Sequence, residues 1–303
     1  MGHSHDHAGH AHGPANYNKA FLIGIILNTA FVITEATYGV LSHSLALIAD
    51  AGHNLSDVLA LVLSWIASLL AKKEPSKRRT YGYRRSSILA ALFNAIFLLV
   101  AIGAIAWEAL QRFGDPAPVT GNTVIWVATV GIIINTFTAL MFLSGSKGDI
   151  NIRGAFLHMA ADAGVSLGVV IAGFVILWTN WLWLDPVISL VIVLVIFIST
   201  WGLLKESFNL SLDAVPSGIN YSLVKEYFDR IPSVINTHDL HIWGISTTEN
   251  ALTVHLIVSD SINRDELMKR CSADLHEKFN IDHATIQLES SLYDCPLAPD
   301  HVI

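Results

Sequence analysis

Residues 44–57 read Ser-Leu-Ala-Leu-Ile-Ala-Asp-Ala-Gly-His-Asn-Leu-Ser-Asp, and residues 156–162 read Phe-Leu-His-Met-Ala-Ala-Asp. Each stretch contains a histidine and, four positions later, an aspartate, within a long run of otherwise apolar residues. This spacing places His53 with Asp57, and His158 with Asp162, on one face of a helix. An ionisable side chain at the centre of a bilayer costs about 2.5–3.5 kcal/mol even on the lenient insertion scale, so such pairs indicate a function.

The two pairs together offer two imidazoles and two carboxylates, a four-coordinate ligand set that suits Zn²⁺. An imidazole binds a metal only when it is neutral, so protons and metal compete for one site. Packing contacts between helices are the alternative, but these are usually made by Ser, Thr, Asn or Gln rather than by paired carboxylates. We therefore predict a transport metal site at His53, Asp57, His158 and Asp162.

The composition separates a membrane part from a soluble part. Only 14% of the 303 residues are charged, and the mean hydropathy is +0.51, whereas a soluble domain averages about 25% charged residues. Residues 1–204 carry a net charge of +1 and residues 205–303 a net charge of −8. An acidic soluble part suits cations and argues against nucleic acid as a partner. We predict a disordered His-rich segment at 1–18, a transmembrane domain at 19–204 and a metal-binding soluble domain at 205–303.

Six apolar segments are long enough to cross about 30 Å of hydrocarbon. Seven Lys and Arg side chains lie in the connection Lys72–Arg85, whereas the connections on the opposite side carry few cations. The positive-inside rule then places both termini and the soluble domain in the cytoplasm. The six predicted spans are Ala20–Leu41, Ser44–Ala71, Ile88–Leu110, Val124–Leu143, Gly154–Leu177 and Trp181–Leu204.

The last third of the chain alternates between helical and strand patterns. Its order of helix, strand, strand, helix, strand predicts a small ferredoxin-like α+β domain. The predicted elements are the helix Ile219–Ile231, the strands His238–Thr247 and Ala251–Ser259, the helix Arg264–Phe279 and the strand Ala284–Glu289.

On these residues the chain resembles the cation diffusion facilitator family, in its zinc-exporting branch. The resemblance is carried by the two stretches quoted above and by Arg79-Thr-Tyr-Gly-Tyr-Arg84, His238-Asp-Leu-His-Ile-Trp243 and Ala284-Thr-Ile-Gln-Leu-Glu289. It covers nearly the whole length and implies a homodimer that exchanges metal for protons. In that family a histidine at the position of His53 goes with zinc over manganese. Cadmium and cobalt stay open, because site geometry alone does not exclude them.

A second candidate metal site lies in the soluble part. Imidazole, carboxylate and thiolate are the protein ligands that zinc takes. The resemblance implies zinc binding by His238, His255 and Glu289, whereas Cys295 matches a ligand of some family members only. For His241 both a ligand role and a structural role stay open. The full candidate set is His238, His241, His255, His283, Glu289 and Cys295.

Three further acidic residues lie in or near the predicted spans. For Asp50, a role around the metal site and a hydrogen bond at a helix end are weighed equally. Glu35 and Glu108 are weaker candidates, and Glu108 is expected at the interface. In the connection after the second span, Arg85 is predicted to pair with Asp213.

The predicted function is a proton-coupled, homodimeric exporter of Zn²⁺ in the plasma (inner) membrane, and not an enzyme. A passive zinc channel is one rival, and it would be insensitive to a pH gradient. A membrane haem protein with histidines on two spans is another, although the adjacent aspartates speak against haem. A metallo-hydrolase would need an open coordination position, which four protein ligands do not leave.

Overall fold

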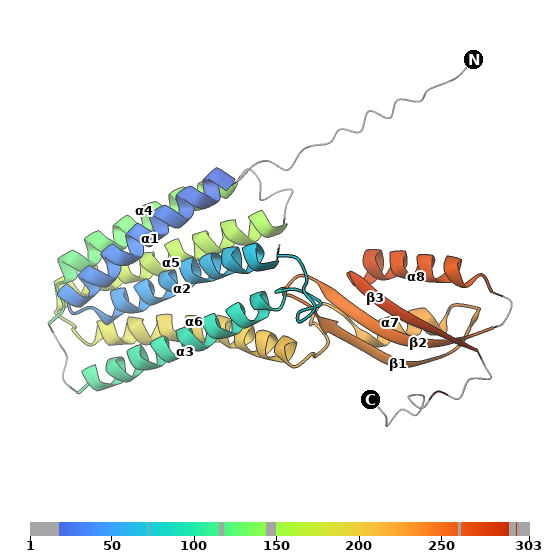
Figure 1. Cartoon of the computed structure of the whole chain (residues 1–303). Helices are drawn as coiled ribbons and strands as arrows, with labels where there is room; N and C mark the ends of the chain where they lie inside the picture. Colours follow the sequence, from blue (N-terminus) through green and yellow to red (C-terminus); the bar gives the residue numbers. More distant parts are fainter. Residues whose placement is uncertain are drawn as a thin grey trace, which may run out of the picture. The chain divides into compact units, whose positions relative to one another are not determined.

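The computed structural model describes residues 18–71, 73–114, 118–143, 150–259, 262–290 and 295. The predicted His-rich segment 1–18 therefore lies outside the described residues, apart from Asn18. Within the described ranges, long helices come first and a mixed helix-and-strand part follows (Figure 1).

Six long helices form the first two thirds of the chain, as the apolar segments predict. Each contains 23 to 30 residues, which at about 1.5 Å per residue is enough to cross a bilayer. The clearest difference from the predicted spans is at the sixth, which continues as a helix to Ser211. The helices are α1 Asn18–Leu41, α2 Leu45–Ala71, α3 Ser86–Arg112, α4 Gly121–Leu143, α5 Ile150–Thr179 and α6 Leu184–Ser211.

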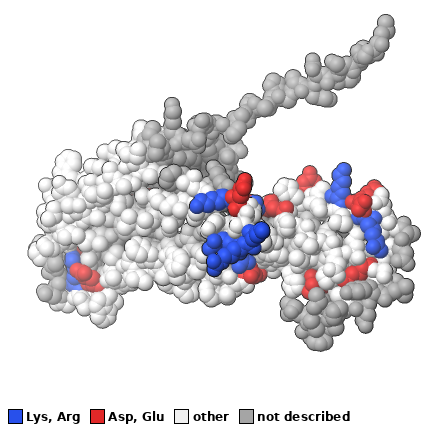
Figure 2. Space-filling view, viewed as in Figure 1, with Lys and Arg blue, Asp and Glu red and all other residues white. Residues whose placement is uncertain are grey.

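The surfaces of these helices suit contact with lipid. Among the side chains that the structure describes, four stretches are long and apolar enough to span a membrane, namely Ser86–Arg112, Gly121–Met141, Met159–Thr179 and Leu184–Ser211. Ile25–Leu41 is a shorter apolar helix. On the face that Figure 2 shows, charged side chains are sparse over the long helices, as expected where lipid replaces water as the solvent.

The chain folds into two compact units. One contains residues up to Val58 together with Ala101–Ile196, and the other contains Leu59–Val100 and Phe197–Ile303. In the first unit α4 packs against α5 and α1. The close approach depends on Gly131, because a Cβ atom there would lie 2.5 Å from Cζ of Phe31.

The start of α2 is fixed by α6 within the first unit. Asp185, in the first turn of α6, is buried. It accepts hydrogen bonds from Oγ of Ser44 at 2.5 Å and from the backbone N–H of Leu45 at 2.8 Å. A carboxylate at a helix N-terminus satisfies N–H groups that have no partner within the helix and interacts favourably with the helix dipole. This cap anchors the helix that carries His53 and Asp57.

The C-terminal part has the predicted element order, with α7 Tyr221–Asp229, β1 Val234–Gly244, β2 Asn250–Val258, α8 Arg264–Phe279 and β3 His283–Ser290. Strand β1 pairs with β2 antiparallel and β2 pairs with β3 parallel, which gives the sheet order β1-β2-β3. One face of the sheet packs on both helices through apolar side chains such as Phe228 of α7, Leu256 of β2 and Leu275 of α8, all fully buried.

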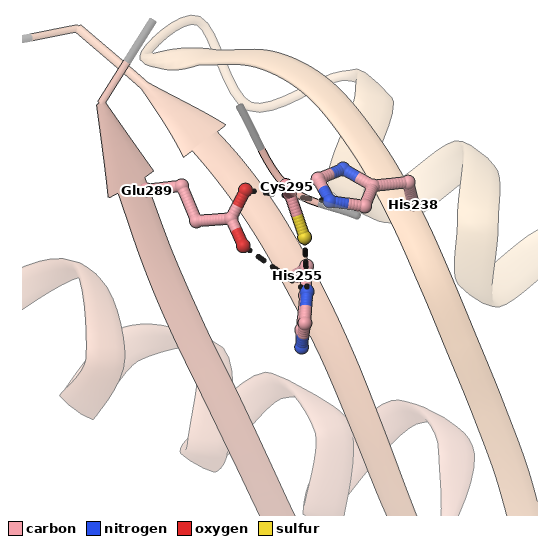
Figure 3. Close-up of side chains that lie close together, drawn as sticks. All are labelled: His238, His255, Glu289 and Cys295. Atoms are coloured by element: carbon pink, nitrogen blue, oxygen red, sulfur yellow. Dashed lines mark hydrogen bonds and ion pairs between the residues drawn. The ribbon is translucent and has the colours of Figure 1, made fainter. Parts of the chain in front are cut away.

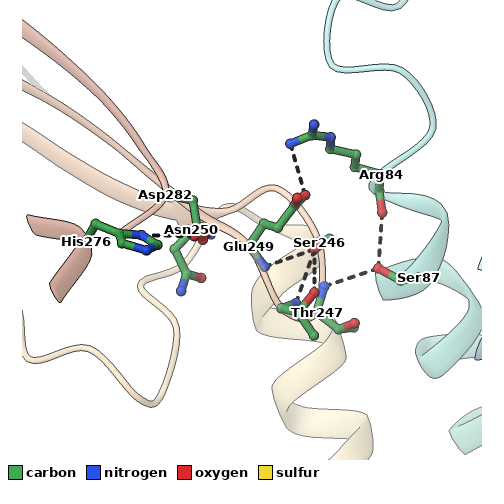
Figure 4. Close-up of polar contacts among 9 residues, drawn as sticks. Arg84, Ser87, Ser246, Thr247, Glu249, Asn250, His276 and Asp282 are labelled. Carbon is green, nitrogen blue, oxygen red and sulfur yellow. Dashed lines mark hydrogen bonds and ion pairs between the residues drawn. The ribbon is translucent and has the colours of Figure 1, made fainter. Parts of the chain in front are cut away.

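Within the second unit, the turn between β1 and β2 contacts the start of α3 (Figure 4). Arg84 forms an ion pair with Glu249 at 3.1 Å, and the backbone N–H of Thr247 donates to Oγ of Ser87 at 3.1 Å. Oγ of Ser246 accepts from the N–H groups of Thr248 and Glu249, which stiffens the turn. The predicted ion pair between Arg85 and Asp213 is also present.

Asp274 of α8 makes the stability of the domain depend on pH. Its carboxylate accepts from Nζ of Lys278 at 2.8 Å and from Oη of Tyr227 at 2.7 Å, and these bonds lower the pKa of Asp274. A lowered folded-state pKa stabilises the fold above the unfolded value near pH 4, and this contribution disappears as pH falls through the folded-state pKa. We expect Asp274→Asn to lower the thermal-unfolding midpoint of the detergent-solubilised chain at pH 7 and to reduce its drop on acidification. Glu277→Gln, at an exposed position of the same helix, is the control, and an equal effect of both variants would contradict the assignment.

Candidate metal sites

The first candidate site joins α2 and α5 in the first unit. Nε2 of His53 lies 3.0 Å from Oδ1 of Asp162 and 3.7 Å from Oδ2 of Asp57. The three ligand atoms lie within 4.8 Å of one another, and Asp162 is buried. Three of the four predicted ligands therefore converge. The fourth, His158, lies one helical turn before Asp162 on α5, and its side chain is outside the described set.

The chemistry of this cluster suits a divalent cation. An imidazole and two carboxylates are ligands that zinc takes in proteins. With both carboxylates ionised and the imidazole neutral, the cluster carries two negative charges in a poorly solvated place. Such charge is costly to bury without compensation. Either one divalent cation or two protons would neutralise it.

Two more carboxyl groups lie close to this site. Glu35 of α1 and Asp50 of α2 are both fully buried. Oε2 of Glu35 accepts from Nδ2 of Asn54 at 3.1 Å, and Oδ2 of Asp50 accepts from Oγ of Ser166 at 3.1 Å. The sequence left the role of Asp50 open and gave Glu35 little weight. The only sequence signal for Glu35 is an acidic residue in an apolar span.

The second candidate site lies on the sheet of the C-terminal part and joins His238, His255, Glu289 and Cys295 (Figure 3). Nε2 of His238 lies 3.3 Å from Oε2 of Glu289, and Nδ1 of His255 lies 3.1 Å from Oε1. Sγ of Cys295 lies 3.5 Å from Nδ1 of His255. All four ligand atoms lie within 4.8 Å of one another.

The sheet explains why these side chains meet. His238 of β1 is the pairing partner of His255 of β2, and Glu289 of β3 pairs with Ile257, two positions further along β2. Successive side chains of a strand point to opposite faces. His255 therefore lies on the face away from Leu256, a core residue, so the cluster occupies the face of the sheet opposite the helices.

A β-bulge brings a further carboxylate to His255. The register of β1 slips by one residue between His238 and His241, and Asp239 there has a left-handed φ of 49°. Bulges re-aim side chains in this way. Oδ2 of Asp239 lies 3.4 Å from Nε2 of His255, and Oδ1 lies 2.9 Å from Nε2 of His241. A carboxylate on one ring nitrogen orients the other nitrogen toward a metal, and sequence patterns do not reveal the bulge.

Two of the six predicted residues lie outside this four-residue cluster. His241 contacts Asp239 instead. His283 lies at the start of β3, six positions before Glu289 along the strand, and its ring packs edge-on against Tyr81 with centroids 5.8 Å apart. Within one chain, the structure therefore groups His238, His255, Glu289 and Cys295 only.

The residues present fit a bound zinc ion. Imidazole, carboxylate and thiolate are all ligands that zinc takes, and four of them suit its tetrahedral coordination. Nδ1 of the buried His238 has no hydrogen-bond partner among the described residues. A buried polar atom without a partner costs free energy, which a metal ligand role for this ring would offset.

Long apolar helices around a carboxylate–imidazole cluster, joined to a small α+β domain with a second cluster, define a transporter of metal cations. Two family models match the chain: the cation efflux transmembrane domain over residues 21–210 and the cytoplasmic domain of cation efflux proteins over residues 216–291. The chain belongs to the cation efflux family, also called the cation diffusion facilitators.

Curated relatives match over almost their full length. The chain is 36% identical to the zinc transporter ZitB of Escherichia coli, over 95% of this chain and 93% of the relative. It is 37% identical to the metal cation efflux system protein CzcD of Cupriavidus metallidurans, over 95% and 90%. It is 34% identical to the cadmium, cobalt and zinc/H(+)-K(+) antiporter of Bacillus velezensis, over 97% and 94%.

Proposed function

We propose that this protein is a proton-coupled secondary transporter that exports Zn²⁺ from the cytoplasm, with Cd²⁺ or Co²⁺ as further cargo. The transported ion binds His53, Asp57, His158 and Asp162. The convergence of His53, Asp57 and Asp162 from two helices carries the proposal. The names of the relatives, which include zinc transporters and a cadmium, cobalt and zinc antiporter, support the choice of cargo.

Charge balance explains the coupling to protons. The two carboxylates and the neutral imidazoles take up a divalent cation without leaving net charge on the site. When the ion leaves, protons on the same groups restore neutrality, because carboxylate and imidazole ligands bind metal only in their deprotonated forms. A rocking movement of the helices then exposes the site to alternate sides, as secondary transporters do. A site that holds neither metal nor protons leaves two carboxylate charges buried without compensation, which costs free energy. The transporter therefore rarely changes its orientation in that state, and zinc movement stays coupled to proton movement.

The proposal extends to topology and assembly. The 19–204 segment spans the plasma (inner) membrane. Both termini lie in the cytoplasm, because the Lys72–Arg85 connection is rich in cations and such connections stay on the cytoplasmic side. The 205–303 domain is cytoplasmic, mediates a homodimer and holds zinc at His238, His255, Glu289 and Cys295. Zinc bound there would link the three strands to one another. Its binding is coupled to zinc binding at the membrane site, so that each site changes the affinity of the other. The segment 1–18 gathers metal weakly.

The test is zinc flux in proteoliposomes with an imposed pH gradient. We expect zinc to move against its gradient when the opposite side is acidic, and each zinc ion to be accompanied by proton movement the other way. The same vesicles without a pH gradient serve as the control. A passive channel would carry zinc only downhill and at a rate independent of the gradient. A visible absorbance band of the purified protein would instead support the haem alternative.

A further inference from the structure

The connection between α2 and α3 contains more cations than its ion pairs use. Its described part, Lys73–Arg85, has six Lys and Arg side chains and one Glu. Arg84 and Arg85 form ion pairs with Glu249 and Asp213. The other four cations have no carboxylate partner among the described residues, and we call them the unpaired cations: Lys73, Lys77, Arg78 and Arg79.

Two of the unpaired cations occupy the tip of a tight turn. The backbone N–H of Ser76 donates to the carbonyl oxygen of Arg79 at 2.9 Å, and the N–H of Arg79 donates back to the carbonyl oxygen of Ser76 at 2.9 Å. The N–H of Arg79 also donates to Oγ of Ser76 at 3.2 Å. Reciprocal bonds of this kind close a two-residue connection. That connection is Lys77-Arg78, and both of its side chains are exposed.

Tyr83 brings the other two unpaired cations to one aromatic ring. The guanidinium of Arg79 lies 4.7 Å from the centroid of this ring, and its Nη1 donates to Oη of Tyr83 at 3.1 Å. Nζ of Lys73 lies 5.8 Å from the same centroid. The backbone turns back toward Lys73 at Gly82, which has a left-handed φ of 66° and where a Cβ atom would lie 3.3 Å from the carbonyl oxygen of Lys73. Backbone bonds and a ring thus hold the cations in place, and neither neutralises their charge.

This arrangement suits a phosphate group at the surface of a bilayer. Like charges gathered in one short segment repel each other, and ammonium and guanidinium groups form strong charge-assisted hydrogen bonds to phosphate oxygens. The transmembrane family model covers both α2, which ends at Ala71, and α3, which begins at Ser86. The connection therefore lies where a helix leaves the membrane and the next one enters it. In Figure 2, Lys and Arg side chains gather at the place that this connection has in Figure 1.

We infer that the four unpaired cations form a binding site for the headgroup of an anionic phospholipid. Basic segments next to a membrane-spanning helix are attracted to anionic lipids, whereas a zwitterionic headgroup carries a cation of its own and gains less from the site. A divalent metal is repelled by the same charges. The net charge of −7 on the chain disfavours nucleic acid. The inference requires only that α2 and α3 cross the membrane, and it does not rest on the proposed cargo or on proton coupling.

Native mass spectrometry of the detergent-solubilised full chain, titrated with phosphatidylglycerol, tests the inference. We expect lipid adducts whose affinity falls as salt is added, because salt screens exposed charges. Lys77→Gln combined with Arg78→Gln should bind the lipid roughly 25-fold more weakly, since each cation near an anionic membrane surface contributes about fivefold. Arg264→Gln combined with Lys269→Gln removes two exposed cations of α8 and should bind the lipid as the unaltered chain does.

Phosphatidylcholine and inorganic phosphate are the comparison ligands. Equal affinity for phosphatidylcholine would overturn the inference, because the site would then not distinguish an anionic headgroup. Displacement of phosphatidylglycerol by an equal concentration of inorganic phosphate would overturn it in favour of a free anion. Undiminished lipid binding by the Lys77, Arg78 variant would place the lipid elsewhere. If that variant instead lost assembly mass while its lipid binding stayed unchanged, the cations would be assigned to acidic side chains of a second copy.

Gly82→Ala separates the folded arrangement from the net charge. It leaves every cation in place, but alanine disfavours the left-handed φ of 66° at this position. We expect the affinity for phosphatidylglycerol to fall in a variant that still elutes as a folded protein in size-exclusion chromatography. An unchanged affinity would overturn the assignment to a built site, because net charge alone would then attract the lipid. Zinc flux is not needed for any of these measurements, so failure of the proposed function would leave their outcome unaffected.

Discussion

Asp162→Asn is expected to abolish zinc transport while the protein stays folded. The carboxylate is buried and lies 3.0 Å from Nε2 of His53. Asparagine keeps the size of the side chain, so no cavity forms, but it removes one of the two negative charges that balance the ion. Removing one partner of a buried charged pair costs about 3–5 kcal/mol. Since about 1.4 kcal/mol is tenfold in affinity, zinc affinity at this site should fall by at least ~100-fold.

Flux into proteoliposomes under a pH gradient measures this effect, with size-exclusion chromatography as the check on folding. Glu108→Gln is the matched control, because it removes a carboxylate from α3 whose side chain is 55% exposed and paired with Arg112. The control should transport at the parental rate. Parental flux in a folded Asp162→Asn protein would mean that this carboxylate is not a ligand of the transported ion.

Glu289→Gln is expected to weaken zinc binding at the proposed site of His238, His255, Glu289 and Cys295. Both oxygens of this carboxylate lie close to imidazole nitrogens, at 3.3 Å from His238 and 3.1 Å from His255. The side chain is nearly fully buried, and a glutamine amide there places N–H donors where a metal needs lone pairs. Removing one partner of a buried charged pair costs about 3–5 kcal/mol, so the affinity of this site for zinc should also fall by at least ~100-fold.

The measurement is zinc bound per chain at equilibrium, carried out on the full chain in an Asp162→Asn background so that only the proposed site on the sheet contributes. Glu277→Gln, on an exposed position of α8, is the control and should bind as the background does. In the otherwise unaltered chain, Glu289→Gln should weaken zinc-dependent dimerisation yet leave residual flux. Undiminished zinc stoichiometry and affinity would exclude Glu289 as a ligand.

The helices, and the placement of His53 beside Asp57, could be predicted because local rules decide them. A membrane leaves the backbone few alternatives to a long helix, so apolar length alone located the six helices. Helical spacing put His53 beside Asp57. The meeting of those two with Asp162 depends on how α2 and α5 pack, which the sequence suggested only through the repeated pattern and the family resemblance. The αββαβ order could also be predicted locally, because the spacing of apolar residues distinguishes a helix from a strand.

Other features depend on the register of the strands and on the places where helices pack against each other. A pattern read along the sequence contains neither. His283 and Glu289 lie on one short strand, yet only Glu289 reaches the cluster, because a strand advances about 3.3 Å per residue. The bulge that turns Asp239 toward His255 contains one extra residue in β1. The composition of the strand does not show where that residue lies. Glu35 is an isolated acidic residue in the sequence, and its hydrogen bond from Asn54 of α2 becomes visible only once the helices are packed.

The cap that Asp185 places on α2 has a mechanical consequence. Oγ of Ser44 and the backbone N–H groups of Leu45 and Ala46 all donate to Asp185 of α6. This end of α2 is therefore anchored, and a tilt of the helix would turn about it. At about 1.5 Å per residue, His53 lies roughly 12 Å along the helix from that anchor and Asp57 roughly 18 Å. A tilt of the helix about its anchored end therefore moves Asp57 about one and a half times as far as His53, which changes the distance between the two side chains and Asp162.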